Sequence, residues 1–409
     1  MSGSGALGLP PLAVVGLGAA VSLYAGKLAR RFGLPSLIGY LITGILMGAS
    51  ILGVVEESAL RHTRFVTDIA LGFVAFTIGS ELSTSSLRQL GSSIVLIILF
   101  ESFMAFAVVF VAVYAVTGGE LAVALVFAAL APASAPAGTV AVIQEYKARG
   151  RLTKALYAVV GFDDGLAILI YGFAAAFARG LVSHHVQGVW HSLMLPAREI
   201  GISVAVGAVM GLVYTLLARR LRTASELPAL TFAFVAMTAG IAARFHLSLI
   251  LACMSIGFVL TNSTPRTAVN RIVMQNRTLM PLVFILFFFL AGAHLDIAAL
   301  PALGLLGIVY ILARSGGKMA GAWLGGVLGG AETKIRRYLG MGILSQAGVA
   351  IGLSLIIAQD FAEIGTPLAD RIASMVITTI AATCVIFEIV GPLLAKRALK
   401  KAGELGREG

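Results

Sequence analysis

Two adjacent aspartates, Asp163 and Asp164, lie in the middle of an otherwise apolar stretch of the sequence, residues 153–178. A carboxylate at the centre of a bilayer costs about 2.5–3.5 kcal/mol on insertion scales, so two of them at that depth indicate a function. Lys318 is equally deep in another apolar stretch, residues 301–330. Two acids and one base inside hydrocarbon predict ion chemistry within a membrane, in which carboxylates hold a cation or carry a proton.

The two aspartates are expected to have different surroundings. Neighbouring residues of a helix point about 100° apart, so Asp163 and Asp164 do not face one small ion equally. We expect one to face a partner and the other to face a cavity. Lys318 is the natural partner, because a lone ammonium and a lone carboxylate at this depth each carry a penalty that pairing offsets. Burial disfavours the charged forms of such groups, so they are suited to binding and releasing protons. A static salt bridge between two helices is the alternative, but it leaves the second acid unexplained.

Further charges also lie in apolar stretches. Arg314 is four residues before Lys318 and shares its helix face, so we expect it to neutralise a carboxylate or a helix C-terminus. Glu388 lies toward the end of the stretch 370–395 and is expected to partner Arg314 or to be a structural acid. Glu101 is expected to lie nearer a helix end, at the membrane interface.

Two of the apolar stretches contain residues that break helices. The stretch 120–143 carries two prolines and a glycine near its midpoint: Pro132, Pro136 and Gly138. Proline removes a backbone donor and clashes with the preceding turn, so this helix should unwind. The stretch 338–359 has a weaker break at 342–348. Unpaired backbone groups at this depth persist only where they line a polar cavity, so both breaks predict such a cavity.

The neutral oxygen donors at the two breaks are candidates to line an ion site: Ser134, Thr139, Ser345 and Gln346. Each of them alone more often bonds to a nearby backbone group, and the adjacent aspartates favour the second role. The two broken spans are an odd number of spans apart, which inverts one copy relative to the other. Transporters built from inverted repeats place their site where two such discontinuous helices cross. This inference rests on hydropathy, because no residue-level repeat is visible.

The composition is that of a membrane protein with many spans. The 409 residues are 59% hydrophobic and only 12% charged, with a mean hydropathy of +0.98, whereas soluble domains carry about 25% charged residues. Runs long enough to cross roughly 30 Å of hydrocarbon predict an all-α polytopic protein of about 13 transmembrane helices. The predicted spans are 9–28, 35–51, 66–82, 93–117, 120–143, 153–178, 199–219, 227–244, 246–262, 279–295, 301–330, 338–359 and 370–395.

The charges are distributed as loops of a membrane protein require. The net charge of +11 does not indicate nucleic-acid binding, because the basic residues punctuate the loops and form no single patch. They gather in alternate loops, such as 147–154 and 396–401. Basic loops stay in the cytoplasm, which predicts an internal C-terminus and, with an odd number of spans, an external N-terminus. No Walker A sequence occurs, so ATP is not expected to drive the protein and no cofactor is expected.

Four glycines follow one face of the stretch 301–330: Gly317, Gly321, Gly325 and Gly329. Small residues at a spacing of four let helix backbones approach one another closely. We expect this glycine stripe to seat Lys318 close to a neighbouring helix and not to touch an ion itself.

The aspartate pair, the broken stretch 120–143 and Lys318 together resemble the monovalent cation:proton antiporters, specifically the second cation:proton antiporter family, which includes bacterial sodium/proton exchangers. The resemblance covers almost the whole chain. It implies that Asp164 is the aspartate that binds the cation and the proton, with Na⁺ held by Asp164 and Asp163. It also implies that Asp163 pairs with a core lysine, here Lys318. This acid and lysine pair is the pattern of the electrogenic members.

The second break departs from that family pattern. Relatives often carry charged residues there, whereas this chain reads Ser345-Gln346-Ala347-Gly348. Potassium/proton exchange or potassium efflux is therefore the alternative to sodium or lithium exchange. Potassium-efflux relatives usually have a soluble nucleotide-binding tail, and the short tail after residue 395 predicts no soluble regulatory domain.

The resemblance also implies an architecture, the sodium/proton antiporter fold. Residues 93–178 and 301–395 are expected to form a moving core. Residues 9–82 and 227–295 are expected to form a scaffold for a homodimer, and 199–219 a linker helix. The implied activity is secondary active exchange of a monovalent cation for protons by elevator-like alternating access in the inner cell membrane.

Two other classes fit the residues less well. An intramembrane aspartyl protease needs two aspartates on facing helices that share a proton, whereas these are adjacent on one helix, so no enzyme is expected. A potassium channel needs a Thr-Val-Gly-Tyr-Gly filter, and the sequence has none.

Overall fold

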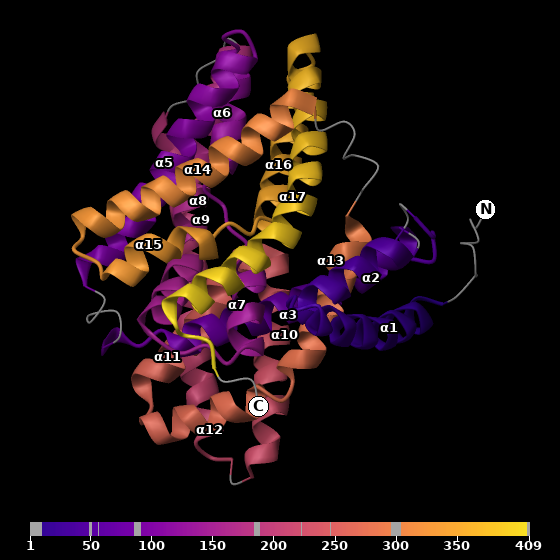
Figure 1. Cartoon of the computed structure of the whole chain (residues 1–409), viewed down its shortest axis with the longest axis vertical. Coiled ribbons are helices and arrows are strands. Elements are labelled where there is room, and N and C mark those ends of the chain that lie inside the picture. Colours follow the sequence, from indigo (N-terminus) through magenta and orange to yellow (C-terminus); the bar gives the residue numbers. More distant parts are fainter. Residues whose placement is uncertain are drawn as a thin grey trace. The chain divides into compact units, whose positions relative to one another are not determined.

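The computed structural model describes residues 10–48, 51–55, 57–85, 91–183, 189–221, 223–245, 247–295 and 304–406. Residues 9, 49–50, 246 and 301–303, which the predicted spans include, lie outside the described residues. The described part of the chain contains helices and no strands, which confirms the predicted all-α class (Figure 1). The helices form two compact units: unit 1 is Met1–Ser85, Val140–Glu145 and Glu199–Ile297, and unit 2 is Ser86–Thr139, Tyr146–Arg198 and Ala298–Gly409.

Unit 1 is built from the first helices of the chain and a middle group. Its helices are α1 (Pro11–Arg31), α2 (Ser36–Met47), α3 (Glu57–Glu81), α10 (Leu227–Phe245), α11 (Leu249–Ser263), α12 (Arg266–Asn276) and α13 (Met280–His294), with the 3-10 helix η1 (Ala224–Glu226). Glycines on both α3 and α11 allow the backbones of these two helices to approach closely. A Cβ added at Gly79 of α3 would lie 2.8 Å from the carbonyl carbon of Met254, and one at Gly257 of α11 would lie 2.6 Å from the nitrogen of Ser80.

Unit 2 carries the helices in which the sequence places its buried charges. They are α5 (Ser92–Val116), α6 (Leu121–Leu130), α8 (Arg151–Ser183), α14 (Gly304–Leu328), α15 (Thr333–Gly342), α16 (Gly348–Ala362) and α17 (Pro367–Ala402). Two further helices, α7 (Pro136–Glu145) and α9 (Val189–Ala218), belong partly to each unit. The breaks between α6 and α7 and between α15 and α16 fall where the sequence predicts them.

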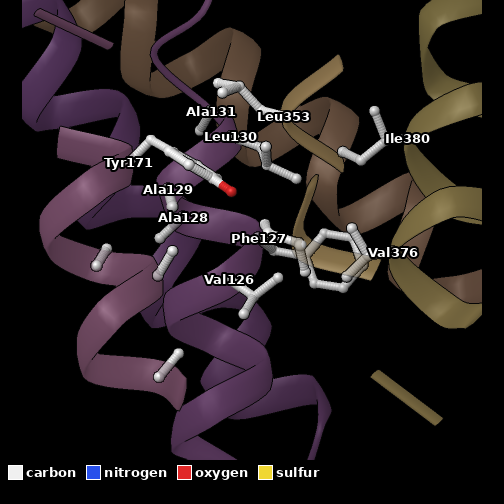
Figure 2. Close-up of a cluster of buried hydrophobic side chains, with 14 of the residues drawn as sticks. Val126, Phe127, Ala128, Ala129, Leu130, Ala131, Tyr171, Leu353, Val376 and Ile380 are labelled. Carbon is white, nitrogen blue, oxygen red and sulfur yellow. The ribbon is translucent and has the colours of Figure 1, made fainter. Parts of the chain in front are cut away.

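A large apolar cluster joins residues of α5, α6, α8, α14, α16 and α17 in unit 2, and Figure 2 shows part of it. The cluster contains Val126, Phe127 and Leu130 of α6, Tyr171 of α8, Leu353 of α16, and Val376 and Ile380 of α17. The ring of Phe127 also packs edge-on against Tyr310 of α14, with centroids 5.9 Å apart. This packing fixes the half-helix that precedes the first break against α8, which carries the two aspartates.

The tail of the chain fixes the other end of α8. The Glu404 carboxylate accepts hydrogen bonds from the backbone nitrogens of Leu152 and Thr153, at 2.8 and 2.7 Å. The first N–H groups of a helix have no partner within the helix and favour a negative charge, so Glu404 caps α8 from 250 residues away in the chain.

The thirteen predicted stretches each contain described helix, but their lengths differ from the prediction. Within the described part of the chain, six helices are long and apolar enough to span a membrane by themselves, whereas α2, α6, α11 and α16 are shorter apolar helices. The predicted spans 246–262 and 279–295 leave residues 263–278 as a loop, and α12 lies there. This helix forms because Val269 and Ile272, three residues apart, bury one of its faces. It bends by 51° into α13.

Candidate functional site

The two helix breaks lie against one another in unit 2. The backbone nitrogen of Ala135 donates to the carbonyl of Ser345, at 2.8 Å. The Ser134 hydroxyl donates to the carbonyl of Ile343 at 3.1 Å, and Thr139 donates to a carbonyl of the same break, that of Gly342, at 2.6 Å. Each break thus satisfies polar groups that the other exposes, and the two discontinuous helices meet at their midpoints as the sequence predicts.

Arg314 holds both breaks through their carbonyl groups. Its Nε and Nη2 donate to the carbonyls of Ala131 and Ala133, at 3.0 and 2.7 Å, and its Nη1 donates to that of Leu344, at 2.8 Å. These carbonyls follow the C-terminal ends of α6 and α15, where helices carry partial negative charge. The fully buried guanidinium therefore neutralises two helix C-termini at once.

Glu388 does not provide the partner that the sequence analysis considered for Arg314. The Arg314 guanidinium lies 4.5 Å from the ring centroid of Phe387, and no ion pair joins it to Glu388 in the described part of the chain. The reason is that the break carbonyls already occupy its donors. Glu388 is buried on α17, one turn before Gly391, which packs against Ser345. Its Oε2 has no hydrogen-bond partner among the residues that the structure describes.

The two remaining candidates at the second break differ in their surroundings. Gln346 donates from Nε2 to the carbonyl of Leu130 and to the hydroxyl of Tyr310, at 3.0 and 2.9 Å. Its Oε1 and the Ser345 hydroxyl are both buried, and neither has a hydrogen-bond partner in the described part of the chain. The second break therefore presents neutral oxygens that are free to act as ligands, while Ser134 and Thr139 use their hydroxyl hydrogens to bind it.

Asp163 and Asp164 are buried in α8, at 0% and 1% exposure. None of their four carboxylate oxygens has a hydrogen-bond partner among the described residues. The Nζ of Lys318 lies 3.7 Å from Oδ2 of Asp163 and also donates to the carbonyl of Pro132 in the first break. Lys318 thus connects the aspartates to the break, and Asp163 faces it as expected.

Glu101 is the site residue that the sequence analysis missed. The sequence predicts it at the membrane interface, but it is fully buried within α5, and its Oε2 lies 2.7 Å from Nζ of Lys318. The expectation was wrong because Glu101 is the tenth of 25 residues in α5. Part of a signal was present in the sequence, since Ser93 and Ala105, eight residues before and four after Glu101, place small residues on the same face of that helix.

The glycine stripe creates this contact. A Cβ added at Gly317 would lie 2.8 Å from Cα of Ala105, and one at Gly325 would lie 2.7 Å from Cα of Ile97. One added at Gly321 would lie 2.6 Å from Cα of Glu101 itself. The backbones of α14 and α5 therefore touch along the stripe, which places Lys318, one turn before Gly321, beside Glu101.

The arrangement combines unpartnered carboxylates with a nearby ammonium in a closed, polar centre of unit 2. Among the described residues, no group of three or more His, Cys, Asp or Glu side chains could hold a metal ion. A cation bound at the aspartates would draw on their carboxylates, and Ser345 and Gln346 carry further neutral oxygens at the second break. Carboxylate and neutral oxygens are hard ligands that suit a small hard cation, and the same carboxylates accept protons.

Comparisons with known proteins agree with this architecture. The sequence profile of the family described as "Sodium/hydrogen exchanger, transmembrane" matches residues 17–397. A structure of the sodium proton antiporter MjNhaP1 from Methanocaldococcus jannaschii at pH 8 is similar, with a TM-score of 0.71, 16% identity, and coverage of 96% of this chain and 98% of that one. An electron-microscopy structure of the same antiporter gives a TM-score of 0.73 and 17% identity over 97% and 99% of the two chains. The comparison with curated proteins found no match. At these identities the structural likeness shows a shared fold.

Proposed function

Because the chain belongs to the sodium/hydrogen exchanger family, we propose that it is a secondary active antiporter that exchanges Na⁺ or Li⁺ for protons. The observation that carries this proposal is the pair of buried aspartates whose four oxygens have no hydrogen-bond partner among the described residues. Leaving such groups unsatisfied in a low-dielectric interior is unfavourable. Binding of a cation or of protons relieves that penalty, and exchange between the two is antiport.

Asp164 is proposed to be the primary ligand, because Lys318 lies nearer to its neighbour Asp163. A cation displaces protons from Asp164 and weakens the contact between Lys318 and Asp163, which spans 3.7 Å. If both aspartates release a proton for each Na⁺ bound, the exchange moves net charge and responds to voltage. The aspartate pair with its lysine therefore supports assignment to the electrogenic type within the second cation:proton antiporter family.

Transport is proposed to proceed by elevator-like alternating access. The residues proposed for the moving core, 93–178 and 301–395, fall mainly within unit 2, and those proposed for the scaffold, 9–82 and 227–295, within unit 1. This division supports the proposal that the core carries the bound ion as a body. The linker 199–219 corresponds to most of α9. We further propose a homodimer in the inner membrane, with the N-terminus outside and the C-terminus in the cytoplasm.

The direct test is proton flux in sealed proteoliposomes with an imposed pH gradient, to which Na⁺, Li⁺ or K⁺ is added in turn. Wild-type protein should collapse the gradient with Na⁺ or Li⁺, and Asp164→Asn should abolish the response. A matched control is Asp360→Asn, because Asp360 is paired with Arg179 away from the site, at 2.9 Å, and should retain exchange. Collapse of the gradient with K⁺ alone would indicate potassium/proton exchange. Full activity of Asp164→Asn would refute the assignment of Asp164 as the ion-binding residue.

A further inference from the structure

We propose that Glu101 is a positioning residue for transport: it keeps the Lys318 ammonium paired with a carboxylate when a cation occupies Asp163 and Asp164. The proposal rests on the antiport function given above and adds a third carboxylate to the site. It assigns Glu101 no direct contact with the transported ion.

Lys318 lies between two carboxylates from different helices. Its Nζ is 2.7 Å from Oε2 of Glu101 on α5 and 3.7 Å from Oδ2 of Asp163 on α8. All three side chains are fully buried. The Ser102 hydroxyl donates to the other oxygen of Glu101, at 2.8 Å, which orients the carboxylate toward the lysine. Glu101 is therefore the nearer partner of Lys318, and Asp163 is the more distant one.

The packing of the helices makes the Glu101 contact the more permanent of the two. Glycines of α14 touch the backbone of α5 on both sides of Glu101, so the two helices are in direct contact there. Asp163 lies on α8, and its oxygens have no hydrogen bond that fixes their direction. A small displacement of Asp163 toward a cation is thus compatible with an unchanged pair between Lys318 and Glu101.

Because Glu101 also pairs with Lys318, cation binding at Asp163 does not leave the ammonium unpaired. If Asp163 were the only acid beside Lys318, a cation taking Asp163 would leave an ammonium buried and unpaired, which is strongly destabilising. With Glu101 present, the ammonium keeps a carboxylate at 2.7 Å throughout.

The charge balance of the cluster leads to the same conclusion. The charged groups that face one another here are Glu101, Asp163, Asp164, Lys318 and Arg314. When all five are ionised, they carry one net negative charge, which a single monovalent cation neutralises. Without Glu101 the other four would be neutral as a set, and a bound cation would leave excess positive charge in the membrane interior.

The test is the kinetics of Na⁺-dependent exchange in proteoliposomes for Glu101→Gln, compared with the wild type and with Glu363→Gln, an exposed control. In Glu101→Gln, Asp163 is the carboxylate that remains beside Lys318, so the ammonium and the cation compete for Asp163. The KM for Na⁺ should rise by about tenfold or more, with a smaller effect on the maximal rate. Adding Lys318→Gln should reverse most of that rise, because the competing charge is gone, and Glu101→Asp should restore part of the affinity.

An unchanged KM in Glu101→Gln, in protein whose wild type exchanges Na⁺ for protons, would overturn this inference and leave the antiport function intact. A wild type without any cation-dependent flux would instead refute the antiport function. Should Glu101→Gln not fold, Ser102→Ala removes only the hydrogen bond that orients Glu101. It should raise the KM in the same direction by a smaller factor, and an unchanged KM in that variant would equally overturn the inference.

Discussion

The chemistry of this protein depends on a few ionisable residues whose partners are unequal. Asp163 and Asp164 are adjacent in the sequence, yet only Asp163 lies within ion-pair distance of Lys318. Glu101 satisfies the lysine more closely, at 2.7 Å. Under the proposed function, this inequality separates Glu101, which keeps Lys318 paired, from the two aspartates, which exchange a proton for a cation.

A first prediction concerns Lys318→Gln. Loss of the ammonium removes a positive charge that competes with protons at Asp163, so protons will compete there more strongly with the cation. The acidic limb of the pH–activity profile should move to higher pH, and the dependence of exchange on an imposed membrane potential should change. Both are measured in proteoliposomes over a series of pH values. A profile and a voltage response identical to those of the wild type would exclude a coupling role for Lys318.

At the scale of helices, the site depends on where two broken helices and one glycine face meet. The sequence predicts both breaks, because proline and glycine interrupt apolar stretches, and it predicts that the glycine stripe contacts a helix. It does not reveal which helix that is, because this depends on tertiary packing. For that reason the pairing of Glu101 with Lys318, and the contacts of Arg314 with the carbonyls of both breaks, could not be predicted.

The glycine stripe provides the second prediction. In Gly321→Ala, the added methyl group meets the backbone of α5 at Phe100 and Glu101, which cannot move aside as a flexible side chain would. Overpacking of this kind destabilises by about 1–3 kcal/mol, so the thermal midpoint in detergent should fall and exchange should decrease.

Gly316→Ala is the matched control on the same helix. A Cβ at Gly316 meets nothing within 4 Å, and alanine favours the helix by about 1 kcal/mol over glycine. This variant should therefore be at least as stable as the wild type. Equal stability of the two variants would show that α14 and α5 are not in tight contact at Gly321.

At the scale of the whole molecule, the chain divides into two compact units, with α7 and α9 shared between them. Hydropathy predicted the apolar stretches well, because each stretch must place an apolar surface either in the protein interior or against the lipid. It predicted their ends poorly. For example, α17 continues to Ala402, since Lys and Arg are favourable in a last helical turn. It also missed α12, whose short amphipathic face depends on the neighbouring helices.

The third prediction concerns orientation in the membrane. Both native cysteines, Cys253 and Cys384, are buried, so they should give little background with a membrane-impermeant maleimide. A cysteine introduced as Glu363→Cys, at an exposed position after α16, should react in intact cells whose outer membrane has been removed. One introduced as Lys400→Cys, also exposed, should react only after permeabilisation. The reverse pattern would contradict the orientation inferred from the basic loops.

The central claim is that the same carboxylates bind either a cation or protons. It is tested most directly by calorimetric titration of purified wild-type protein with Na⁺ over a series of pH values, beside Asp164→Asn. The apparent Kd for Na⁺ should rise by about tenfold for each unit that the pH falls if one proton competes, and by about a hundredfold if two do. Binding should be lost in Asp164→Asn. An apparent Kd that does not change with pH, or Na⁺ binding that survives in Asp164→Asn, would contradict the account.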